Sequence, residues 1–495
     1  MELQIPMAFR RGLLTAALLG AVVLGGSALR FYGLDAQSLW NDELSSWRQS
    51  HHETIPAVIE QGVRPTPYPP AFPVLLYFVE KYVGESETAL RIPSAVAGVL
   101  AIIATFFLAR QLYSVREGMV AAGLMAFSYQ PVYYSQEARA YSLLLLFSIL
   151  SSHFWFRLRA QLEVRDRISG SIAAAYVACA VVTQYLHHFG LLLVAIQLGA
   201  LGGLFVLRPQ ALARVFAISA AIFAAYVPWI EYLVEDFGEG HGYLPQPGLH
   251  SISEFWRFLF FDTSGYFAWF VALLFGNAIW RWIAKRQAAI SGDLVVWLRS
   301  PTTLLIAWLV IPFALAYLRS LTSSPILNNR NLIVSLPPAM VLLARAITCA
   351  TSAARLQVLI ASAIAAVLIY GPFVNGGYYR FPRKEQFREA AAAVASRGGQ
   401  LADVRVIAYA WASESFDYYL ARTGAPVRVS LLAGSEHDIP RTEVFLETED
   451  PEHVWFLAGH RRPDPAYIQF LDRRLEFVDH LPLYGAFARL YRRRE

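Results

Sequence analysis

The sequence has 495 residues, of which 56% are hydrophobic and only 16% are charged, and its mean hydropathy is +0.40. This composition excludes an ordinary soluble globular fold. The formal net charge of +5 would suit nucleic-acid binding, but the basic residues lie in short loops between apolar runs, so membrane topology explains them better. The two cysteines, both in or beside apolar segments, indicate no disulfide framework.

Apolar runs long enough to cross a bilayer recur from residue 12 to about residue 373. The first run follows Arg10 and Arg11 and has no small-residue cleavage site followed by a soluble domain, which favours a retained helix over a removed signal peptide. About eleven membrane-spanning helices are therefore predicted, at approximately residues 12–29, 92–109, 118–133, 141–156, 169–186, 189–207, 213–230, 265–281, 301–319, 331–345 and 356–373.

Basic residues assign the orientation of these helices. Arg10 and Arg11 place the N-terminus in the cytoplasm by the positive-inside rule. Residues 71–83 are apolar but few, and they include Glu80 and Lys81, so we expect this segment to lie flat at the membrane interface. The basic clusters of the later loops then face the cytoplasm, and the odd number of spans puts the C-terminus outside.

The chain changes character after residue 373, where it becomes polar and charged. We expect residues 1–373 to form the transmembrane domain and residues 374–495 to form a compact extracytoplasmic α/β domain. The elements predicted in the second domain are helices at 384–396 and 416–422 and strands at 404–409, 453–458 and 486–491.

Two adjacent carboxylates, Asp42 and Glu43, follow the first hydrophobic helix. They begin an outer loop of about residues 30–91, which is too long for a simple connector and is therefore expected to carry function. Ionisable groups at a membrane boundary are costly, and they usually mark chemistry or transport. The alternative is a solvated pair that stabilises the N-terminus of a helix.

Later outer loops add polar side chains that could bind a substrate. Glu137 and Arg139 stand two residues apart at a helix boundary, where they are poor membrane anchors. The candidate substrate and donor-phosphate ligands are Tyr134, Glu137, Arg139, His187, His188 and Arg330. An ion pair between Glu137 and Arg139, interfacial packing of the two histidines and membrane anchoring by Arg330 remain open alternatives.

The sequence does not decide whether the protein binds a metal ion. His187, His188, Glu137 and His241 could furnish ligands for a divalent cation, but their spacing is not the compact spacing of a metal motif. We therefore assign no cofactor from the sequence and keep a divalent cation as an alternative.

These groups could support transfer of a glycosyl unit from a lipid phosphate. A carboxylate can remove the proton of an acceptor hydroxyl as it attacks the anomeric carbon, and a nearby negative charge stabilises the oxocarbenium character that develops. Arginine or protonated histidine can offset the charge of the departing phosphate. A polyprenyl tail would occupy an apolar groove between helices.

Four spaced motifs, which occur in order within residues 10–350, carry a resemblance to a known class. The motifs are Leu39-Trp40-Asn41-Asp42-Glu43, Tyr68-Pro69-Pro70, Leu90-Arg91-Ile92-Pro93-Ser94 and Tyr133-Tyr134-Ser135-Gln136-Glu137-Ala138-Arg139. Through them the chain resembles bacterial integral-membrane glycosyltransferases of the GT-C class, and in particular the family that includes protein O-mannosyltransferases and the aminoarabinose transferase acting on lipid A.

The resemblance implies a polyprenyl-phosphate-sugar donor, inversion at the anomeric carbon and an extracytoplasmic active site in a bacterial inner membrane. It implies that Asp42 is the base with Glu43 beside it, and that Arg139 and Arg330 hold the donor phosphate. The acceptor could be a lipid, a glycan or a protein hydroxyl, and the sugar is not identified.

The alternative function is a transporter or flippase of lipid-linked saccharides. Transporters usually place ionisable groups near the middle of the membrane within broken helices. In this sequence the acids gather beyond the outer ends of the helices, which favours surface chemistry.

Overall fold

The computed structural model describes residues 7–66, 68–165, 168–239, 244–260, 271–277, 299–398, 401 and 403–494. It divides the chain into two compact units. The helical unit comprises Met1–Tyr32, His52–Tyr77 and Arg91–Gly376, and the sheet unit comprises Gly33–His51, Phe78–Leu90 and Gly377–Glu495.

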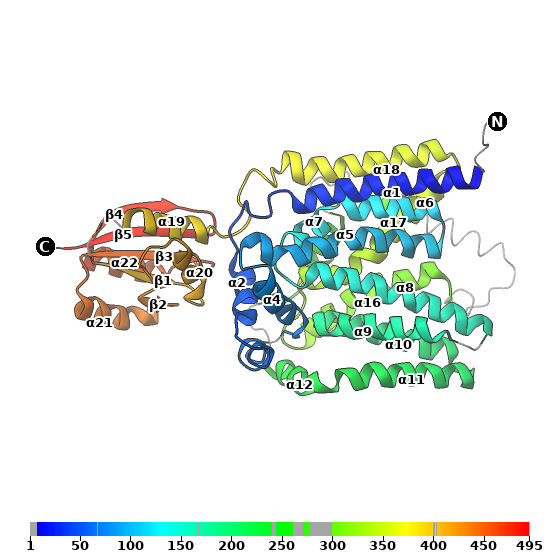
Figure 1. Cartoon of the computed structure of the whole chain (residues 1–495), viewed down its shortest axis with the longest axis horizontal. Coiled ribbons are helices and arrows are strands. Elements are labelled where there is room, and N and C mark those ends of the chain that lie inside the picture. The colour runs from blue at the N-terminus through cyan, green and yellow to red at the C-terminus, as the bar shows by residue number, and fades with distance from the viewer. Residues whose placement is uncertain are drawn as a thin grey trace. The chain divides into compact units, whose positions relative to one another are not determined.

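The helical unit consists of long apolar helices that lie side by side (Figure 1). Its elements, including those that begin or end in the other unit, are α1 (Met7–Phe31), α3 (Ile55–Ala57), η1 (Val58–Val63), α4 (Ala71–Tyr82), α5 (Glu87–Leu112), α6 (Val115–Phe127), α7 (Tyr129–Ser135), α8 (Tyr141–Arg165), α9 (Gly170–Leu186), α10 (His188–Phe205), α11 (Pro209–Tyr226), η2 (Val227–Trp229), α12 (Ile230–Glu239), α13 (His250–Phe260), α16 (Pro301–Thr322), η3 (Asn329–Ser335), α17 (Leu336–Ala350), α18 (Ala354–Ile369) and η4 (Tyr370–Asn375).

Among the described residues, eight helices are long and apolar enough to cross a membrane. They confirm a multispanning membrane protein, while the total of eleven stays a prediction. The predicted span 169–186 corresponds to the slightly shorter apolar helix α9, and most of the predicted span 265–281 lies outside the described residues. The segment predicted to lie at the interface forms α4, which has 12 residues and is not among the eight.

The predicted span 118–133 is interrupted. Ser128 separates α6 from α7 and has extended backbone, with ψ 144°. Pro131 explains the break, because it has no N–H to donate to the carbonyl of Phe127 in a continuous helix. The interruption creates a short helix, α7, whose C-terminal end leads directly into the predicted loop of Glu137 and Arg139.

The most buried helix of this unit is α17. Every residue from Leu336 to Ala344 is buried, and Pro337 and Pro338 begin the helix where missing N–H groups cost least. The short η3 precedes it and contains Arg330. A fixed central helix therefore holds the position of the residues just before it.

The sheet unit contains a five-stranded sheet with helices on both of its faces (Figure 1). The strand order is β2-β1-β3-β5-β4; β1 is parallel to β2 and β3, and β5 is antiparallel to β3 and β4. The elements are α2 (Asn41–Ser50), α19 (Phe387–Gly398), β1 (Val404–Tyr409), α20 (Glu414–Arg422), β2 (Leu431–Ala433), η5 (Glu436–Asp438), α21 (Ile439–Glu449), β3 (His453–Gly459), α22 (Pro465–Arg474), β4 (Leu475–Pro482) and β5 (Ala486–Arg493).

Alternation along the strands explains the layers of this sheet, because successive side chains point to opposite faces. Ile407 and Phe456 pack in one core cluster with Leu446 of α21 and Leu471 of α22. All seven residues of β3 are buried, which is expected of a strand covered on both sides. The predicted α/β domain is confirmed, while β2, β4, α21 and α22 are additional to the predicted elements.

The division of the chain differs from the predicted boundary at residue 373. Two segments of the first outer loop, residues 33–51 and 78–90, belong to the same compact unit as the C-terminal residues. Direct contacts explain this: Arg388 forms an ion pair with Glu87 at 3.2 Å, and the Tyr418 hydroxyl donates to the backbone oxygen of Glu85. These two segments and the C-terminal residues therefore form one compact unit, whereas residues 52–77 between the segments belong to the helical unit.

Candidate active site

The first-loop acids occupy the first turn of α2. The backbone N–H of Trp40 donates to Oε2 of Glu43 at 3.3 Å, which satisfies one of the donors that a helix N-terminus leaves open. Negative side chains in a first turn are also favoured by the helix dipole. The helix-capping alternative therefore describes part of the role of Glu43.

The two acids differ in their surroundings. Glu43 is completely buried, and its Oε2 lies 3.0 Å from Nζ of Lys384, which is itself 4% exposed. Asp42 is half-buried, and its backbone oxygen accepts a hydrogen bond from Ser46. A buried, paired carboxylate is poorly placed to take a proton from a substrate, so Asp42 is the better candidate for a base.

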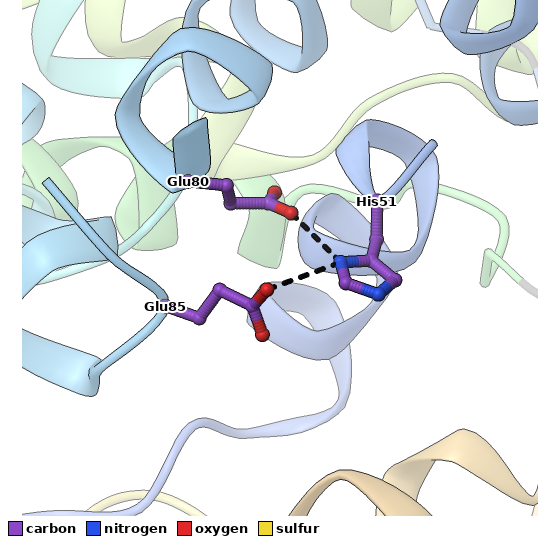
Figure 2. Close-up of side chains that lie close together, drawn as sticks. All are labelled: His51, Glu80 and Glu85. Carbon is purple, nitrogen blue, oxygen red and sulfur yellow. Dashed lines mark hydrogen bonds and ion pairs between the residues drawn. The ribbon is translucent and has the colours of Figure 1, made fainter. Parts of the chain in front are cut away.

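A second polar cluster of the sheet unit lies at the other end of α2. Nδ1 of His51 lies 2.9 Å from Oε2 of Glu80 and 3.6 Å from Oε1 of Glu85, and Figure 2 shows the imidazole between the two carboxylates. Ser50 donates to the other oxygen of Glu80, and Arg422 pairs with the other oxygen of Glu85 at 2.7 Å. Burial raises the pKa of Glu80.

This cluster could hold a metal ion. Among the described residues, it is the one group of at least three His, Cys, Asp or Glu side chains whose ligand atoms lie within 4.8 Å of one another. One imidazole nitrogen and two carboxylate oxygens suit zinc or manganese. The four residues named from the sequence as metal ligands are different ones, and His241 among them lies outside the described residues.

In the helical unit, buried hydrogen bonds hold the loop of Glu137 and Arg139. The side-chain amide of Gln136 donates to the backbone oxygens of Leu29, Arg30 and Tyr32 at the end of α1. Gly98 of α5 allows this close packing, because a Cβ there would lie 1.9 Å from Oγ of Ser135. The loop is thus fixed by neighbours on two helices.

Aromatic rings surround the Arg139 guanidinium. Its Cζ lies 5.0 Å from the ring centre of Tyr68 and 5.9 Å from that of Tyr141, and its backbone oxygen accepts a hydrogen bond from Ser94 at 3.0 Å. Cation–π contacts of this kind strengthen when they are removed from water, and Arg139 is 6% exposed. Glu137 is completely buried.

His187 lies at the N-terminus of α10, where its Nδ1 accepts a hydrogen bond from the backbone N–H of Phe189 at 3.2 Å. Burial, together with the charges of His188, Arg139 and Arg330, lowers the pKa of His187 to about 3. At neutral pH the imidazole is therefore uncharged. It contributes a hydrogen-bonding group beside the two arginines and no positive charge.

Arg330 and Tyr134 line one polar pocket of about 620 Å³. Burial and the charge of Glu137 raise the pKa of the Tyr134 hydroxyl, which therefore stays protonated and can donate a hydrogen bond. The other lining residues come from α7, α13 and the segment before α17; they are Gln130, Glu254, Arg257, Phe258, Asn328 and Asn329. Two arginines and three side-chain amides around one cavity suit a phosphate with attached hydroxyl groups.

The sequence reasoning missed Arg257, which is exposed on α13 and lines this pocket. The sequence did contain a pattern that could have indicated this helix. Residues 250–260 have the spacing of an amphipathic helix, with apolar Phe255, Phe258 and Leu259 on its buried side. What the sequence lacked was any indication that the polar side of this helix meets the residues before α17.

Each predicted site residue thus has a place in one of the two units. Asp42 and Glu43 lie on α2 of the sheet unit, whereas the six predicted ligands lie in the helical unit. Within the helical unit, Tyr134 and Arg330 share the pocket, and Arg139 lies near His187. His188 is half-buried, with its ring centre 6.4 Å from that of His187.

An apolar groove of about 600 Å³ is also present in the helical unit, between α1, α6, α17 and α18. Its walls are formed mainly by alanine, valine, leucine and phenylalanine, with Arg116, Thr348, Gln357 and Ser362 as polar neighbours. A groove of this kind is what a hydrocarbon chain would occupy.

Part of the sequence matches a known protein family. Residues 67–230 match the model of the family described as dolichyl-phosphate-mannose-protein mannosyltransferase. The matched part contains Tyr134, Glu137, Arg139 and both histidines of the candidate site. No curated protein matches the sequence.

Solved structures of membrane glycosyltransferases share the fold over most of the chain. ArnT from Cupriavidus metallidurans bound to undecaprenyl phosphate is 14% identical, with a TM-score of 0.55 over 96% of this chain and 97% of that one. Archaeal oligosaccharyltransferase AglB from Archaeoglobus fulgidus, in complex with an inhibitory peptide and a dolichol-phosphate, is 12% identical, with a TM-score of 0.56 over 98% and 75%.

An Archaeoglobus fulgidus oligosaccharyltransferase complex with Zn and sulfate is 14% identical, with a TM-score of 0.55 over 89% of this chain and 67% of that one. These likenesses confirm the resemblance seen in the sequence motifs. The chain therefore has the fold of the GT-C membrane glycosyltransferases, and its residues 67–230 carry the pattern of the mannosyltransferase family of that class.

Proposed function

We propose that this protein is a membrane glycosyltransferase that moves a sugar from a polyprenyl-phosphate donor to an acceptor hydroxyl outside the cytoplasm. The observation that carries the proposal is the polar pocket of Arg257, Arg330 and Tyr134 in a chain of GT-C fold. Guanidinium groups bind phosphate oxygens in pairs, and a protonated phenol adds one more donor. ArnT with undecaprenyl phosphate and AglB with dolichol-phosphate support a donor of this type.

The proposed reaction is a single displacement with inversion. The acceptor oxygen attacks the anomeric carbon, the bond from that carbon to the phosphate oxygen breaks, and polyprenyl phosphate leaves. Asp42 accepts the proton of the acceptor hydroxyl. Arg330 and Arg257 offset the charge that grows on the departing phosphate, while Arg139 adds a fixed positive charge near His187.

Glu43 has a supporting role in this proposal. Its ion pair with Lys384 and its bond to the Trp40 N–H fix the first turn of α2, on which Asp42 stands. A base must lie within hydrogen-bond reach of the proton that it takes, so the geometry of this turn matters as much as the charge of Asp42.

The direct test is transfer from a labelled polyprenyl-phosphate sugar in membranes that contain the Asp42→Asn variant. We expect the rate to fall by about 10²–10⁴-fold, the usual contribution of a general base. Asp35→Asn, an exposed acid of the same loop, is the matched control and should transfer like wild type. Wild-type transfer by Asp42→Asn would refute the base assignment, and donor translocation without transfer would favour a flippase.

We also propose that the pocket faces the outside of a bacterial inner membrane. Ser323 follows α16 near Arg330, whereas Ser169 lies between α8 and α9, and both are exposed. In a background without Cys179 and Cys349, an impermeant thiol reagent should label Ser323→Cys in intact cells and Ser169→Cys only after the membrane is opened. The reverse pattern would invert the orientation.

A divalent cation at His51, Glu80 and Glu85 is the metal site that we propose for this chain. The nitrogen and carboxylate ligands of the cluster, and the zinc in the Archaeoglobus structure, support it. Ser50 and Arg422 would orient the two carboxylates through their second oxygens.

A further inference from the structure

The sheet unit contains a basic pocket of about 410 Å³ that the transfer chemistry does not use. It lies where β3 ends and where the β4–β5 hairpin turns back. None of the described lining residues is acidic. The pocket is lined by five basic side chains, which are those of His460, Arg461, Arg462, His480 and Arg489.

The backbone places these side chains together at one edge of the sheet. Gly459 at the end of β3 pairs with Ala486 at the start of β5. The next residue, His460, has φ 63°, and its N–H donates to the backbone oxygen of Gly485 at 3.1 Å. Left-handed backbone at a non-glycine residue is uncommon, and it tends to occur where a site must be shaped.

Some of the pocket's cations are already engaged by the protein. Nδ1 of His460 lies 2.9 Å from Oε1 of Glu385. Arg461 donates to the backbone oxygen of Gly434 at 2.7 Å, and its guanidinium lies 4.4 Å from the ring centre of Trp411. These contacts fix two side chains of the pocket, and the only carboxylate among them is that of Glu385.

Arg462 and Arg489 have hydrogen-bonding capacity to spare. Within the described part of the chain, Arg462 is exposed and forms no ion pair. Arg489 reaches the hydroxyl of Tyr491 at 3.3 Å and Asp472 at 3.5 Å, but its buried Nε has no hydrogen-bond partner. An anion in the pocket would accept hydrogen bonds from the exposed guanidinium of Arg462, which offers five N–H donors.

The place of the pocket in the sheet also suits a ligand. From β1 the chain goes to β2 on one side and then to β3 on the other, so the strand order reverses next to β1. In open α/β sheets, ligands bind beyond the carboxyl ends of the strands near such a reversal. The pocket begins at the carboxyl end of β3, and Arg461 connects it to Trp411, a residue that is 62% exposed.

We propose that this pocket binds the phosphate or carboxylate group of an anionic saccharide. If the protein is the glycosyltransferase proposed above, this saccharide is part of the acceptor. The identification of the saccharide as the acceptor rests on the proposed function, whereas the binding of the anion does not. Arginine and histidine side chains supply charge-assisted hydrogen bonds to the anion. The exposed indole beside Arg461 offers a flat apolar surface to a sugar ring.

The test measures binding of glucose 6-phosphate by calorimetry to the full-length protein in nanodiscs of phosphatidylcholine, with no donor present. Neutral glucose is the ligand control. The double variant Arg462→Gln/His480→Gln removes two exposed basic side chains of the pocket, and Arg428→Gln/His437→Gln removes an exposed arginine and histidine of the same unit outside it. We expect the first variant to bind at least tenfold more weakly and the second to bind like wild type.

Equal affinities of all three proteins, or equal weakening in both variants, would overturn the site. A lipid headgroup is distinguished by repeating the titration in nanodiscs that contain phosphatidylglycerol. If the sugar phosphate then no longer binds to wild type, the pocket takes lipid and the saccharide assignment fails. Asp42→Asn should bind the sugar phosphate normally, so loss of transfer and loss of this binding are separate results.

Discussion

Glu43 and Lys384, which stand 341 positions apart in the sequence, form a buried ion pair of 3.0 Å. The pair joins the first turn of α2 to the residues just before α19, within a single compact unit. Removing two charges from water is expensive, and such a pair persists only where its geometry and further hydrogen bonds are good. The bond from Trp40 to Glu43 supplies one of these.

The first prediction concerns this ion pair. Lys384→Met leaves the Glu43 carboxylate buried without its cation, and we expect it to lower the free energy of unfolding by about 3–5 kcal/mol. Adding Glu43→Gln should restore much of the loss, because no buried charge then remains. Unfolding of the four proteins in detergent completes the double-mutant cycle, and additive effects would contradict the coupling.

The second prediction concerns the polar pocket of the helical unit. Arg330→Gln and Arg257→Gln should each weaken donor binding by about 10–100-fold, since a charge-assisted hydrogen bond contributes about 1.5–3 kcal/mol. Donor titrations in nanodiscs measure this effect. Arg110→Gln, an exposed arginine at the C-terminal end of α5, serves as the control. Unchanged donor affinity in both pocket variants would remove the phosphate from this pocket.

The third prediction uses the low pKa of His187. Its pKa in the folded protein is about 3, below the ordinary value of 6.5, so the unfolded chain binds a proton that the native protein does not. Stability should therefore fall as the pH drops below 6.5, by about 1.4 kcal/mol per pH unit from this residue. His187→Gln should flatten the pH dependence between pH 7 and 5, whereas the exposed His437→Gln should not; equal slopes would show that His187 is charged.

The fourth prediction concerns the cluster of His51, Glu80 and Glu85. Micromolar Zn²⁺ should raise the unfolding temperature of wild type, because a ligand that binds only the native state stabilises it. Glu80→Gln removes one carboxylate ligand and should abolish the increase. Glu60→Gln, which alters an acid paired with Arg64 elsewhere, should leave it unchanged. A wild-type protein indifferent to zinc and manganese would leave the cluster as an ion pair.

The sequence was sufficient to identify a multispanning membrane protein, whereas the roles of the two acids stay predictions. Long apolar runs predict membrane helices for two reasons. The hydrocarbon core of the bilayer has a nearly constant thickness, which sets the length of a spanning helix, and every backbone N–H and C=O inside it must form a hydrogen bond within the protein. The strand at 404–409 was predicted with its observed bounds, since a short apolar run in a polar region has few alternatives. The break at Ser128 was missed, because Pro131 lies inside an otherwise continuous apolar run.

Distinguishing Asp42 from Glu43 shows where sequence and tertiary structure divide. Adjacent carboxylates look alike in the sequence, and only the resemblance to a known family implied that Asp42 is the base with Glu43 beside it. Folding separates them, because successive helical positions point about 100° apart, so Glu43 reaches Lys384 while Asp42 stays half-exposed. Lys384 lies in a segment that carries no motif, and its partner could not be identified without the fold.

The sequence by itself thus determined that this is a multispanning membrane protein with two acids beyond its first hydrophobic helix, since hydropathy depends on nearby residues. The tertiary structure decided which distant residues come together: Lys384 pairs with Glu43, Arg257 and Arg330 line one pocket, and Arg462 and Arg489 line another. These arrangements depend on how helices and strands pack. Packing brings together residues that are far apart in the sequence, and no local sequence pattern indicates which of them will be neighbours.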